Sequence, residues 1–421
     1  MNKKIFWIYA LSSAIYFTQG IESLPSQGLF YYFKETLKFP AEKIMLISSI
    51  ITLAWLVKPL IGYVIDNFFS KKIWIFLALA IDIILVLFLG LAHLPLFILI
   101  TILIITSTNA AFRDVAVDGI MCVEGKTRNA TGKIQSIQWI SFSVSGLLTG
   151  IAGGLIAEKW GYRAGFMCLI PIYILVGLVT HFYKEEKTHL NNPATTLSGD
   201  LKKLFSHKKL LIICLFIFLY KYSPSFGTPL FFIQRDAFKW DKIWIGALGT
   251  ISMVFSVIGS VLYYKFSTRI RIKKWLFFSV FAGALTTLSY LYYTPATAII
   301  YDVLYRLIGM FIYLMVMDFM ARNTIPGLEA TSFALLCSVS NLALVTSNLS
   351  GAYLLPLIGL KWLIVISALT SFLCLFLINK IDETPKLGEA KLPEKVSEPN
   401  WARPNCPRKC QSPTGLDLPP E

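Results

Sequence analysis

Long runs of uncharged, mostly apolar residues recur throughout this chain. They include Ile134–Ala157, Ala164–Tyr183, Ile243–Tyr264 and Trp275–Tyr301. A helix needs about 20 apolar residues to cross the hydrocarbon core of a bilayer. Only 15% of the 421 residues are charged, whereas soluble globular proteins have roughly 25%. The sequence therefore predicts an all-α integral membrane protein that crosses the lipid bilayer many times.

Twelve membrane-spanning segments can be drawn through these runs. Their predicted bounds are 5–31, 40–66, 72–92, 94–119, 131–157, 163–184, 208–234, 241–266, 273–292, 296–320, 329–356 and 361–380. With a cytoplasmic N-terminus, the cytoplasmic loops hold roughly twice as many lysines and arginines as the opposite loops, in agreement with the positive-inside rule. We therefore expect both termini in the cytoplasm. The same bias accounts for the net charge of +15 without a nucleic-acid partner.

The longest polar stretch inside the chain divides these segments into two groups of six. We expect an N-terminal six-helix bundle at 1–184, a cytoplasmic interdomain loop at 185–207, a C-terminal six-helix bundle at 208–381 and a disordered cytoplasmic tail at 382–421. The tail differs from the rest in composition, because it is rich in Pro, Glu and Lys and lacks an apolar period.

The two halves also repeat one another in sequence. KETLKF at 34–39 and RDAFKW at 235–240 match in charge and size and are 201 residues apart. Asp118 and Asp318 are 200 residues apart, and so are the Ala-Thr pairs that begin at Ala130 and Ala330. Three matches in the same order indicate a duplicated six-helix unit. Two such parallel repeats make up the fold of the major facilitator superfamily.

A series of short motifs narrows this expectation. The most specific are Lys58–Pro59, RDVAVD at 113–118 and PGLEAT at 326–331, and GYVIDNFFSKK at 62–72 partly matches the loop signature of major facilitators. From about residue 15 to 355 the chain resembles the folate–biopterin transporter family of this superfamily. The resemblance implies a central cavity lined by segments 1, 4, 7 and 10. It also implies secondary transport of a folate or pterin-type solute by alternating access, commonly coupled to protons.

Ionisable side chains at membrane depth are rare and usually face the interior of a helix bundle. Arginine binds carboxylates through planar, bidentate contacts and lysine acts as a compact point charge, so both suit an anionic solute. A carboxylate can accept hydrogen bonds from the amino-pyrimidinone edge of a pterin, and a buried carboxylate can also hold a proton. The residues predicted to bind the solute are Arg113, Glu22, Lys221, Arg306 and Lys58. The carboxylates predicted to carry a coupled proton are Asp114, Asp302 and Glu22.

A second group of charged residues lies near the cytoplasmic ends of the segments and is predicted to form a gate. Its members are Asp66, Lys71, Asp118, Glu124, Arg128, Asp318 and Arg322. Arg113 and Asp114 match Tyr313 and Leu314 at the 200-residue offset, so they belong to one half only and are the better candidates for solute or proton binding.

Several of these residues also have a purely structural interpretation. Asp302 and Arg306 are four residues apart on one helix and are spaced to neutralise each other. Lys58 precedes Pro59, which loosens the helix, and it can equally be part of the scaffold. Asp82 lies on a segment expected outside the cavity, where a structural partner is favoured over a ligand.

Other functions remain open from the residues alone. One alternative is a major facilitator for another polar or anionic solute, such as a muropeptide, a nucleotide derivative or an amino-acid-like molecule. A remote alternative is an intramembrane enzyme that holds Mg²⁺ between Asp114 and Asp118, although no second acidic cluster faces this pair. The sequence has no nucleotide-binding loop, so we expect no cofactor and no metal. We expect a monomer in the plasma membrane or the bacterial inner membrane.

Overall fold

The computed structural model describes residues 3–39, 47, 50–51, 55–185, 204, 206–240, 242–378 and 380. Helices and turns account for all the regular structure of these residues, in agreement with the all-α prediction. Most of the predicted interdomain loop and the whole predicted tail at 382–421 lie outside the described residues. Residues 1–383 form one compact unit.

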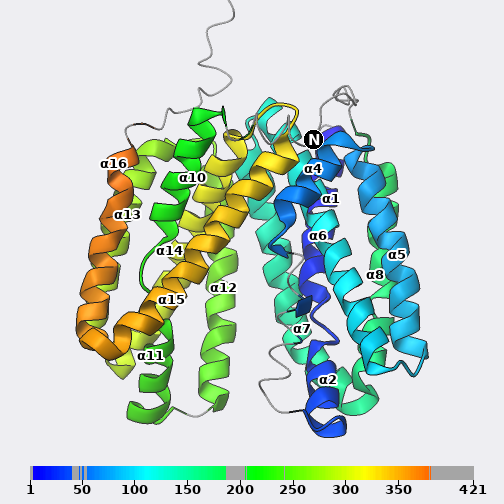
Figure 1. Cartoon of the computed structure of the whole chain (residues 1–421), viewed down its shortest axis with the longest axis horizontal. Helices are drawn as coiled ribbons and strands as arrows, with labels where there is room; N and C mark the ends of the chain where they lie inside the picture. Colours follow the sequence, from blue (N-terminus) through cyan, green and yellow to red (C-terminus); the bar gives the residue numbers. More distant parts are fainter. Residues whose placement is uncertain are drawn as a thin grey trace, which may run out of the picture. The chain divides into compact units, whose positions relative to one another are not determined.

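The first half of the chain, residues 3–185, forms the helices drawn in blue to green-cyan (Figure 1). These are α1 (Lys3–Ile21), α2 (Ser26–Tyr31), the π-helix η1 (Tyr32–Thr36), α4 (Lys58–Asn67), α5 (Lys71–Leu91), α6 (Leu96–Thr127), α7 (Thr131–Met167) and α8 (Ile170–Phe182). Helix α1 packs against α6, α7 and α8, and α5 packs against α6, α7 and α8. We call this part the N-terminal half.

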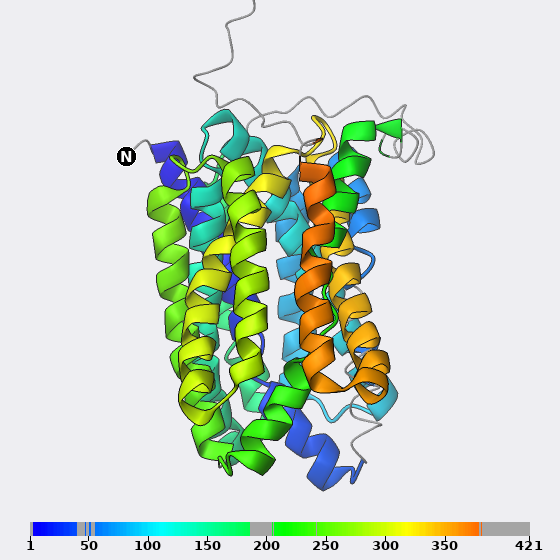
Figure 2. The same cartoon turned by 90° about the vertical axis from the view of Figure 1, so that its left-hand side faces the viewer.

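The second half, residues 204–380, is drawn in green to orange (Figure 1). It comprises α10 (Lys208–Lys221), α11 (Gly227–Phe232), the π-helix η3 (Ile233–Ala237), α12 (Lys242–Phe266), α13 (Ile272–Ser289), the 3-10 turn η4 (Tyr290–Tyr292), α14 (Pro295–Arg322), α15 (Glu329–Thr370), the 3-10 turn η5 (Ser371–Cys374) and α16 (Leu375–Ile378). The long helices of this half run side by side (Figure 2). We call this part the C-terminal half.

Six helical stretches of the described chain are long and apolar enough to cross a membrane. They are Lys71–Leu91, Leu96–Thr127, Leu155–Phe182, Ile272–Tyr292, Pro295–Arg322 and Glu329–Ile378. Ile5–Ile21 and Ile251–Phe266 are shorter apolar helices. Large apolar side chains such as Phe97 and Leu285, 81% and 72% exposed, cover the outside of these helices. Lipid is the solvent that such a surface requires, which makes the chain a multi-pass membrane protein.

Two glycines interrupt the longest helices. Helix α7 contains Gly161 with a φ of 71°, and α15 contains Gly359 with a φ of 73°. Only glycine adopts this left-handed region without strain. Each break lies in the gap between two predicted segments, at 158–162 and at 357–360. It therefore marks the turn between two predicted membrane-spanning segments.

The first helix of each half is broken at matching places. Helix α1 ends at Ile21 and α2 starts at Ser26, while α10 ends at Lys221 and α11 starts at Gly227. Pro25 and Pro224 lie in the two breaks, where the missing N–H of proline removes a helical hydrogen bond. The proline-containing stretches SLPSQG and SPSFGTP therefore coincide with the two breaks.

The internal repeat is visible in the backbone. Both short helices are followed by a π-helix, η1 and η3, whose bounds differ by 201 residues, the offset found in the sequence. Lys38 and Lys239 follow these π-helices with φ of 53° and 58°. A left-handed conformation is uncommon for any residue other than glycine. Its recurrence at the same offset indicates that the two halves share one folding pattern.

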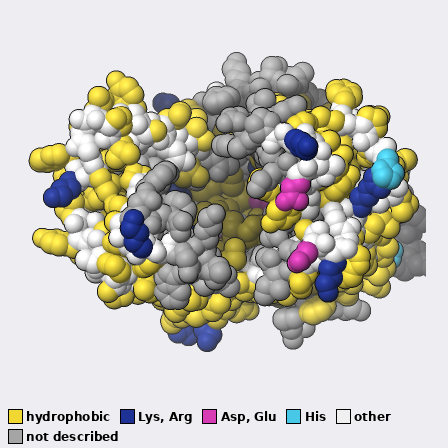
Figure 3. Space-filling model, turned by 90° about the horizontal axis from the view of Figure 1, so that it is seen from below, with side chains coloured by type: hydrophobic (Ala, Val, Ile, Leu, Met, Phe, Trp, Pro, Cys, Tyr) yellow, Lys and Arg dark blue, Asp and Glu magenta, His cyan; other side chains and the backbone are white. Residues whose placement is uncertain are grey.

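The two halves contact each other at the end of the unit where the N-terminus lies (Figure 1). Helix α4 packs against α15, and α7 packs against α12 and α14. Gly62 of α4 lies so close to α15 that a Cβ atom there would be 2.7 Å from the Cα atom of Thr331. At the opposite end, where α2 and α11 lie, the surface has a central hollow with a floor of hydrophobic side chains (Figure 3). The unit is closed at one end and open at the other.

Candidate functional site

A buried arginine joins three helices of the N-terminal half. Arg113 of α6 is 1% exposed and forms ion pairs with Glu22, in the break after α1, and with Asp82 of α5. The hydroxyl of Tyr173 donates to Glu22 at 2.9 Å, and the amide of Asn109 donates to Asp82 at 2.9 Å. Buried charges are stable only when paired and hydrogen-bonded. Asp82, expected to have a structural role, is thus a direct partner of Arg113.

A second ion pair lies one residue further along α6. The Lys58 ammonium is 2.5 Å from Asp114 Oδ2, and Gln19 Nε2 donates to Asp114 Oδ1 at 2.6 Å. The same ammonium lies 4.4 Å from the centroid of the Trp55 ring, a favourable cation–π distance. Lys58 is the first residue of α4, so this pair ties the start of α4 to the middle of α6.

Asp118 lies one turn beyond Asp114 and has a different environment. It is 5% exposed, and its Oδ1 accepts hydrogen bonds from the Tyr16 hydroxyl at 2.9 Å and from Gln138 Nε2 at 3.3 Å. Both donors belong to the N-terminal half. Asp118 therefore differs from Asp66 and Asp318, whose hydrogen bonds cross between the halves.

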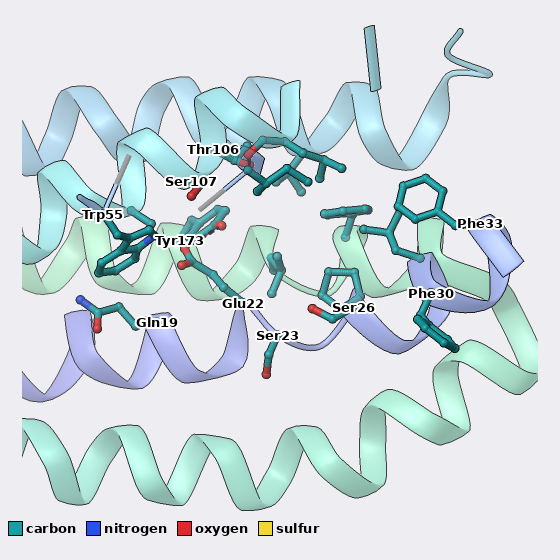
Figure 4. A pocket seen from close by; sticks show the side chains of 18 residues that line it. Gln19, Glu22, Ser23, Ser26, Phe30, Phe33, Trp55, Thr106, Ser107 and Tyr173 are labelled. Atoms are coloured by element: carbon teal, nitrogen blue, oxygen red, sulfur yellow. Dashed lines mark hydrogen bonds between the residues drawn. The ribbon is translucent and has the colours of Figure 1, made fainter. Parts of the chain in front are cut away.

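A cavity of about 430 Å³ opens beside the break in α1 (Figure 4). Its volume falls in the roughly 300–1,000 Å³ range of small-molecule sites. The polar residues that line it are Gln19, Glu22, Ser23, Ser26, Thr106, Ser107 and Tyr173. The aromatic residues that line it are Phe30, Phe33, Trp55 and Phe166. Of the predicted solute-binding residues, Glu22 lines the cavity directly. Arg113 contacts the lining residues Glu22 and Tyr173, and Lys58 contacts the lining residue Trp55.

The predicted residues of the C-terminal half lie apart from this cavity. Lys221, the last residue of α10, is half-buried, and its ammonium lies 4.8 Å from the centroid of the Tyr313 ring. Asp302 accepts a hydrogen bond from Ser252. Arg306 is exposed, and within the described part of the chain no ion pair joins it to Asp302. The expected mutual neutralisation of Asp302 and Arg306 is absent from this conformation.

The gate residues Asp66 and Lys71 lie where α4 meets α15. Asp66 Oδ2 accepts from the backbone N–H of Thr331 at 2.8 Å and from its hydroxyl at 2.7 Å, and Oδ1 accepts from the N–H of Ala330 at 3.3 Å. The Lys71 ammonium is 3.6 Å from Asp66. Because the N-terminus of a helix carries partial positive charge, the first turn of α15 holds this carboxylate well.

Asp318 forms the corresponding contact from the C-terminal half. It accepts hydrogen bonds from the hydroxyl of Thr131 in α7 and from the hydroxyl of Tyr263 at 2.8 Å. Arg322 binds the same carboxylate through two nitrogens at 2.9 and 2.8 Å. Thr131 and Thr331, which are 200 residues apart, thus each bind an aspartate of the opposite half.

The last predicted gate pair, Glu124 and Arg128, forms an ion pair within α6 and its C-terminal end. The Tyr183 hydroxyl donates to Glu124 at 3.3 Å. Nearby, the Lys126 ammonium donates to the carbonyl of Thr324 at 2.8 Å and so crosses between the halves. Six of the seven predicted gate residues therefore lie at or beside the closed end in ion pairs.

Sequence reasoning missed the uncharged partners in these networks. Gln19, Tyr173, Tyr16 and Thr331 hold carboxylates, yet a single Gln, Tyr or Thr in an apolar segment has no spacing that sets it apart from packing residues. In the sequence, Thr331 stands out only as part of the repeat and of the PGLEAT motif. Tyr16, Gln19 and Glu22 follow one another at intervals of three residues, a spacing that makes each side chain a neighbour of the next on a helix and is the signal that could have found Tyr16 and Gln19.

The arrangement of helices is similar to that of solved transporters. The fucose:proton symporter of E. coli superposes with a TM-score of 0.69 at 14% identity, over 89% of this chain and 98% of that one. A proton:xylose symporter gives a TM-score of 0.70 at 12% identity, over 91% and 97% of the two chains. The fold is therefore that of the major facilitator superfamily.

Relatives in sequence narrow the class further. The chain is 24% identical over 374 residues to the folate-biopterin transporter of Synechocystis, covering 84% of this chain and 76% of the relative. It is 23% identical over 400 residues to folate transporter 1 of Plasmodium falciparum, covering 87% and 78%. Residues 19–396 match the BT1 family, and the chain belongs to that family. It is a secondary transporter of a small-molecule solute and not an enzyme, as its sequence predicted.

Proposed function

We propose that this transporter carries a folate or pterin-type solute by alternating access and that protons drive the movement. The observation that carries the proposal is the cavity of about 430 Å³ at the break in α1, where a carboxylate, several hydroxyls and aromatic rings face one space (Figure 4). The names of the relatives supply the solute class, and the residues of the cavity suit it. No second solute class is favoured by any contact described above.

The chemistry of the cavity matches the pterin ring. Tyr173 and Arg113 both bind Glu22 through Oε1, so Oε2, which has no partner among the described residues, can accept from the amino and N–H groups of a ligand. Trp55, Phe30 and Phe33 present aromatic surface to the same space. Offset stacking of aromatic rings contributes about 0.5–1.5 kcal/mol beyond the burial of their area. A flat heterocycle with donors on one edge satisfies both features.

The carboxylates of a folate require a cationic partner. A lysine or arginine that already forms an ion pair within the protein is not available for this role. Arg113 and Lys58 are held by carboxylates of the protein, so we assign them to orienting Glu22 and Asp114. Lys221 has no ion pair among the described residues, and Arg306 is exposed. We assign Lys221 and Arg306 to the anionic part of the solute. Asp114, Asp302 and Glu22 stay candidates for the proton.

The proposal also fixes an orientation in the membrane. We propose twelve membrane-spanning segments in two six-helix bundles, both termini in the cytoplasm and a monomer in the plasma membrane or the bacterial inner membrane. The closed end, which bears the N-terminus, then faces the cytoplasm, and the hollow seen in Figure 3 faces outward. This conformation would receive solute from outside the cell.

A stabilisation screen followed by uptake tests the proposal. Thermal unfolding of the purified protein is measured with folates, pterins, nucleotides, peptides and muropeptides, and proteoliposomes are then assayed for uptake with and without an inward proton gradient. Folates or pterins should raise the unfolding temperature, and the gradient should drive their accumulation. Glu22→Gln should weaken pterin binding, whereas Glu35→Gln, which changes an exposed carboxylate of η1, should not. Stabilisation and uptake of another class alone would overturn the solute assignment.

A further inference from the structure

The core of the N-terminal half contains more acids than bases. Glu22, Asp82, Asp114 and Asp118 are the four carboxylates of the network, and Arg113 and Lys58 are its two cations. An ionised carboxylate without a partner is costly in a medium of low dielectric constant and takes up a proton instead. At least one of the four is therefore neutral when the cavity holds no cation.

The contacts show which carboxylate lacks a cation. Glu22 and Asp82 both touch Arg113, and Asp114 touches Lys58. Asp118 has only neutral donors, Tyr16 and Gln138. Within the described part of the chain no basic nitrogen lies within ion-pair distance of it.

The internal repeat provides a comparison within the same molecule. Asp318 is the counterpart of Asp118 at the 200-residue offset, and Arg322 binds it from four residues further along α14. The residue four positions after Asp118 is Cys122, which is buried and carries no charge as a thiol. The duplicated aspartate thus forms an ion pair with Arg322 in one half, whereas in the other half no cation of the described residues lies within ion-pair distance of it.

Asp118 is also placed where the two halves separate. Helix α6 packs against α14 and α15 of the C-terminal half. The titratable groups that interact with Asp118 are Tyr16 of α1, Lys58 of α4, Asp114 and Cys122 of α6, Tyr313 of α14 and Cys337 of α15. Tyr313 and Cys337 belong to the C-terminal half, so a separation of the halves at the closed end would take them away from Asp118 and expose its carboxyl group to water.

We propose that Asp118 is the site of the coupled proton, which it holds as a neutral carboxylic acid in the conformation described here. When the halves separate at the closed end, the O–H bond breaks, the proton passes to water on that side, and Asp118 becomes a carboxylate. Lys58, which forms an ion pair with Asp114 one turn away on α6, can then be shared between Asp114 and Asp118. The inference rests on the proposed proton-driven transport, and it assigns the proton to Asp118 in place of the candidates Asp114, Asp302 and Glu22.

An infrared measurement tests the protonation without any solute. A carboxylic acid has a C=O stretching band separate from the bands of carboxylates and amides. We expect this band in the wild-type protein, its loss in Asp118→Asn and its retention in Asp318→Asn, the counterpart held by Arg322. Tyr16→Phe removes a hydrogen bond to Asp118 and should shift the band in frequency. A band that persists in Asp118→Asn, or that does not shift in Tyr16→Phe, overturns the proposal.

A transport measurement tests the coupling. In proteoliposomes, Asp118→Asn should lose accumulation driven by a proton gradient but keep exchange of solute between the two sides, because asparagine resembles the neutral acid. Proton-driven accumulation by Asp118→Asn would contradict the inference. If the wild-type protein moves neither folate nor pterin, the proposed solute fails, while the infrared result still decides whether Asp118 holds a proton.

Discussion

The carboxylate of Asp66 accepts hydrogen bonds from both the backbone N–H and the hydroxyl of Thr331, which lies 265 residues further along the chain. This contact joins the end of α4 to the first turn of α15 and holds the two halves together at the closed end. In a transporter that alternates between two conformations, such a contact must exist in one conformation and be absent from the other. The strength of this contact therefore affects the equilibrium between the two conformations.

Replacing Asp66 by Asn should shift the protein toward the conformation open at this end. Hydrogen bonds to charged groups contribute about 1.5–3 kcal/mol each, and about 1.4 kcal/mol changes an equilibrium tenfold. We expect at least about a tenfold increase in the maleimide reactivity of Cys337, measured in a variant whose other cysteines are Ser. Glu158→Gln, which alters an exposed carboxylate of α7, should leave the reactivity unchanged. Equal reactivity in Asp66→Asn and the parent would contradict this role.

Arg113 should be important for stability as well as for transport. Arg113→Ala leaves Glu22 and Asp82 without a cation, and breaking a buried ion pair in this way costs about 3–5 kcal/mol. We expect a clear fall in the thermal unfolding temperature of the protein in detergent. Adding Asp82→Asn removes one of the unpaired charges and should recover part of the loss. The absence of any recovery would show that the charge of Asp82 is not what destabilises the variant.

Lys221 should distinguish folates from simple pterins. We expect Lys221→Gln to raise the KM for folate by about 10- to 100-fold, because a charge-assisted hydrogen bond of about 1.5–3 kcal/mol is lost. Transport of a pterin without a glutamate group should change little. Lys58→Gln is the comparison: it leaves Asp114 without its cation and should impair both solutes. Equal losses for folate and pterin in Lys221→Gln would remove Lys221 from the anion site.

The two left-handed lysines give a test of the repeat that does not depend on transport. Lys38 and Lys239 are exposed and have φ of 53° and 58°. A left-handed conformation costs residues other than glycine roughly 1–2 kcal/mol. Lys38→Gly and Lys239→Gly should each raise the unfolding temperature slightly, and Lys38→Val and Lys239→Val should each lower it. Opposite signs at the two positions would argue against equivalent turns.

Much of the fold follows from local signals in the sequence. The apolar runs predict helices because the bilayer admits few other structures, and Pro25 and Pro224 predict the two breaks because proline cannot continue a helix. The 201-residue offset could be detected because the segments at 34–39 and 235–240 form equivalent turns and therefore contain similar residues. The left-handed φ of Lys38 and Lys239 was not predicted, because nothing about lysine favours it.

The sequence draws attention to the buried charges of the candidate site but does not show how they pair. Burial makes Arg113 and Asp114 conspicuous in an apolar run, but their partners depend on how each helix is rotated about its axis. Asp82 was expected outside the cavity, yet the rotation of α5 turns it toward Arg113. Asp118 was grouped with the gate because it aligns with Asp318, and the alignment could not show that its nearest donors are Tyr16 and Gln138.

The closed end is held largely by hydrogen bonds to Asp66 and Asp318 across the halves. Water can replace every one of these bonds once the halves begin to part, and a hydrogen bond to a charged group that is exchanged for water changes the free energy by only about 1.5–3 kcal/mol. An interface of packed leucine side chains could not exchange its contacts for hydrogen bonds to water. Thermal motion is thus sufficient to open and reclose this end many times, so the protein needs no fuel of its own to change conformation. The concentrations on the two sides of the membrane then decide the direction of net flow.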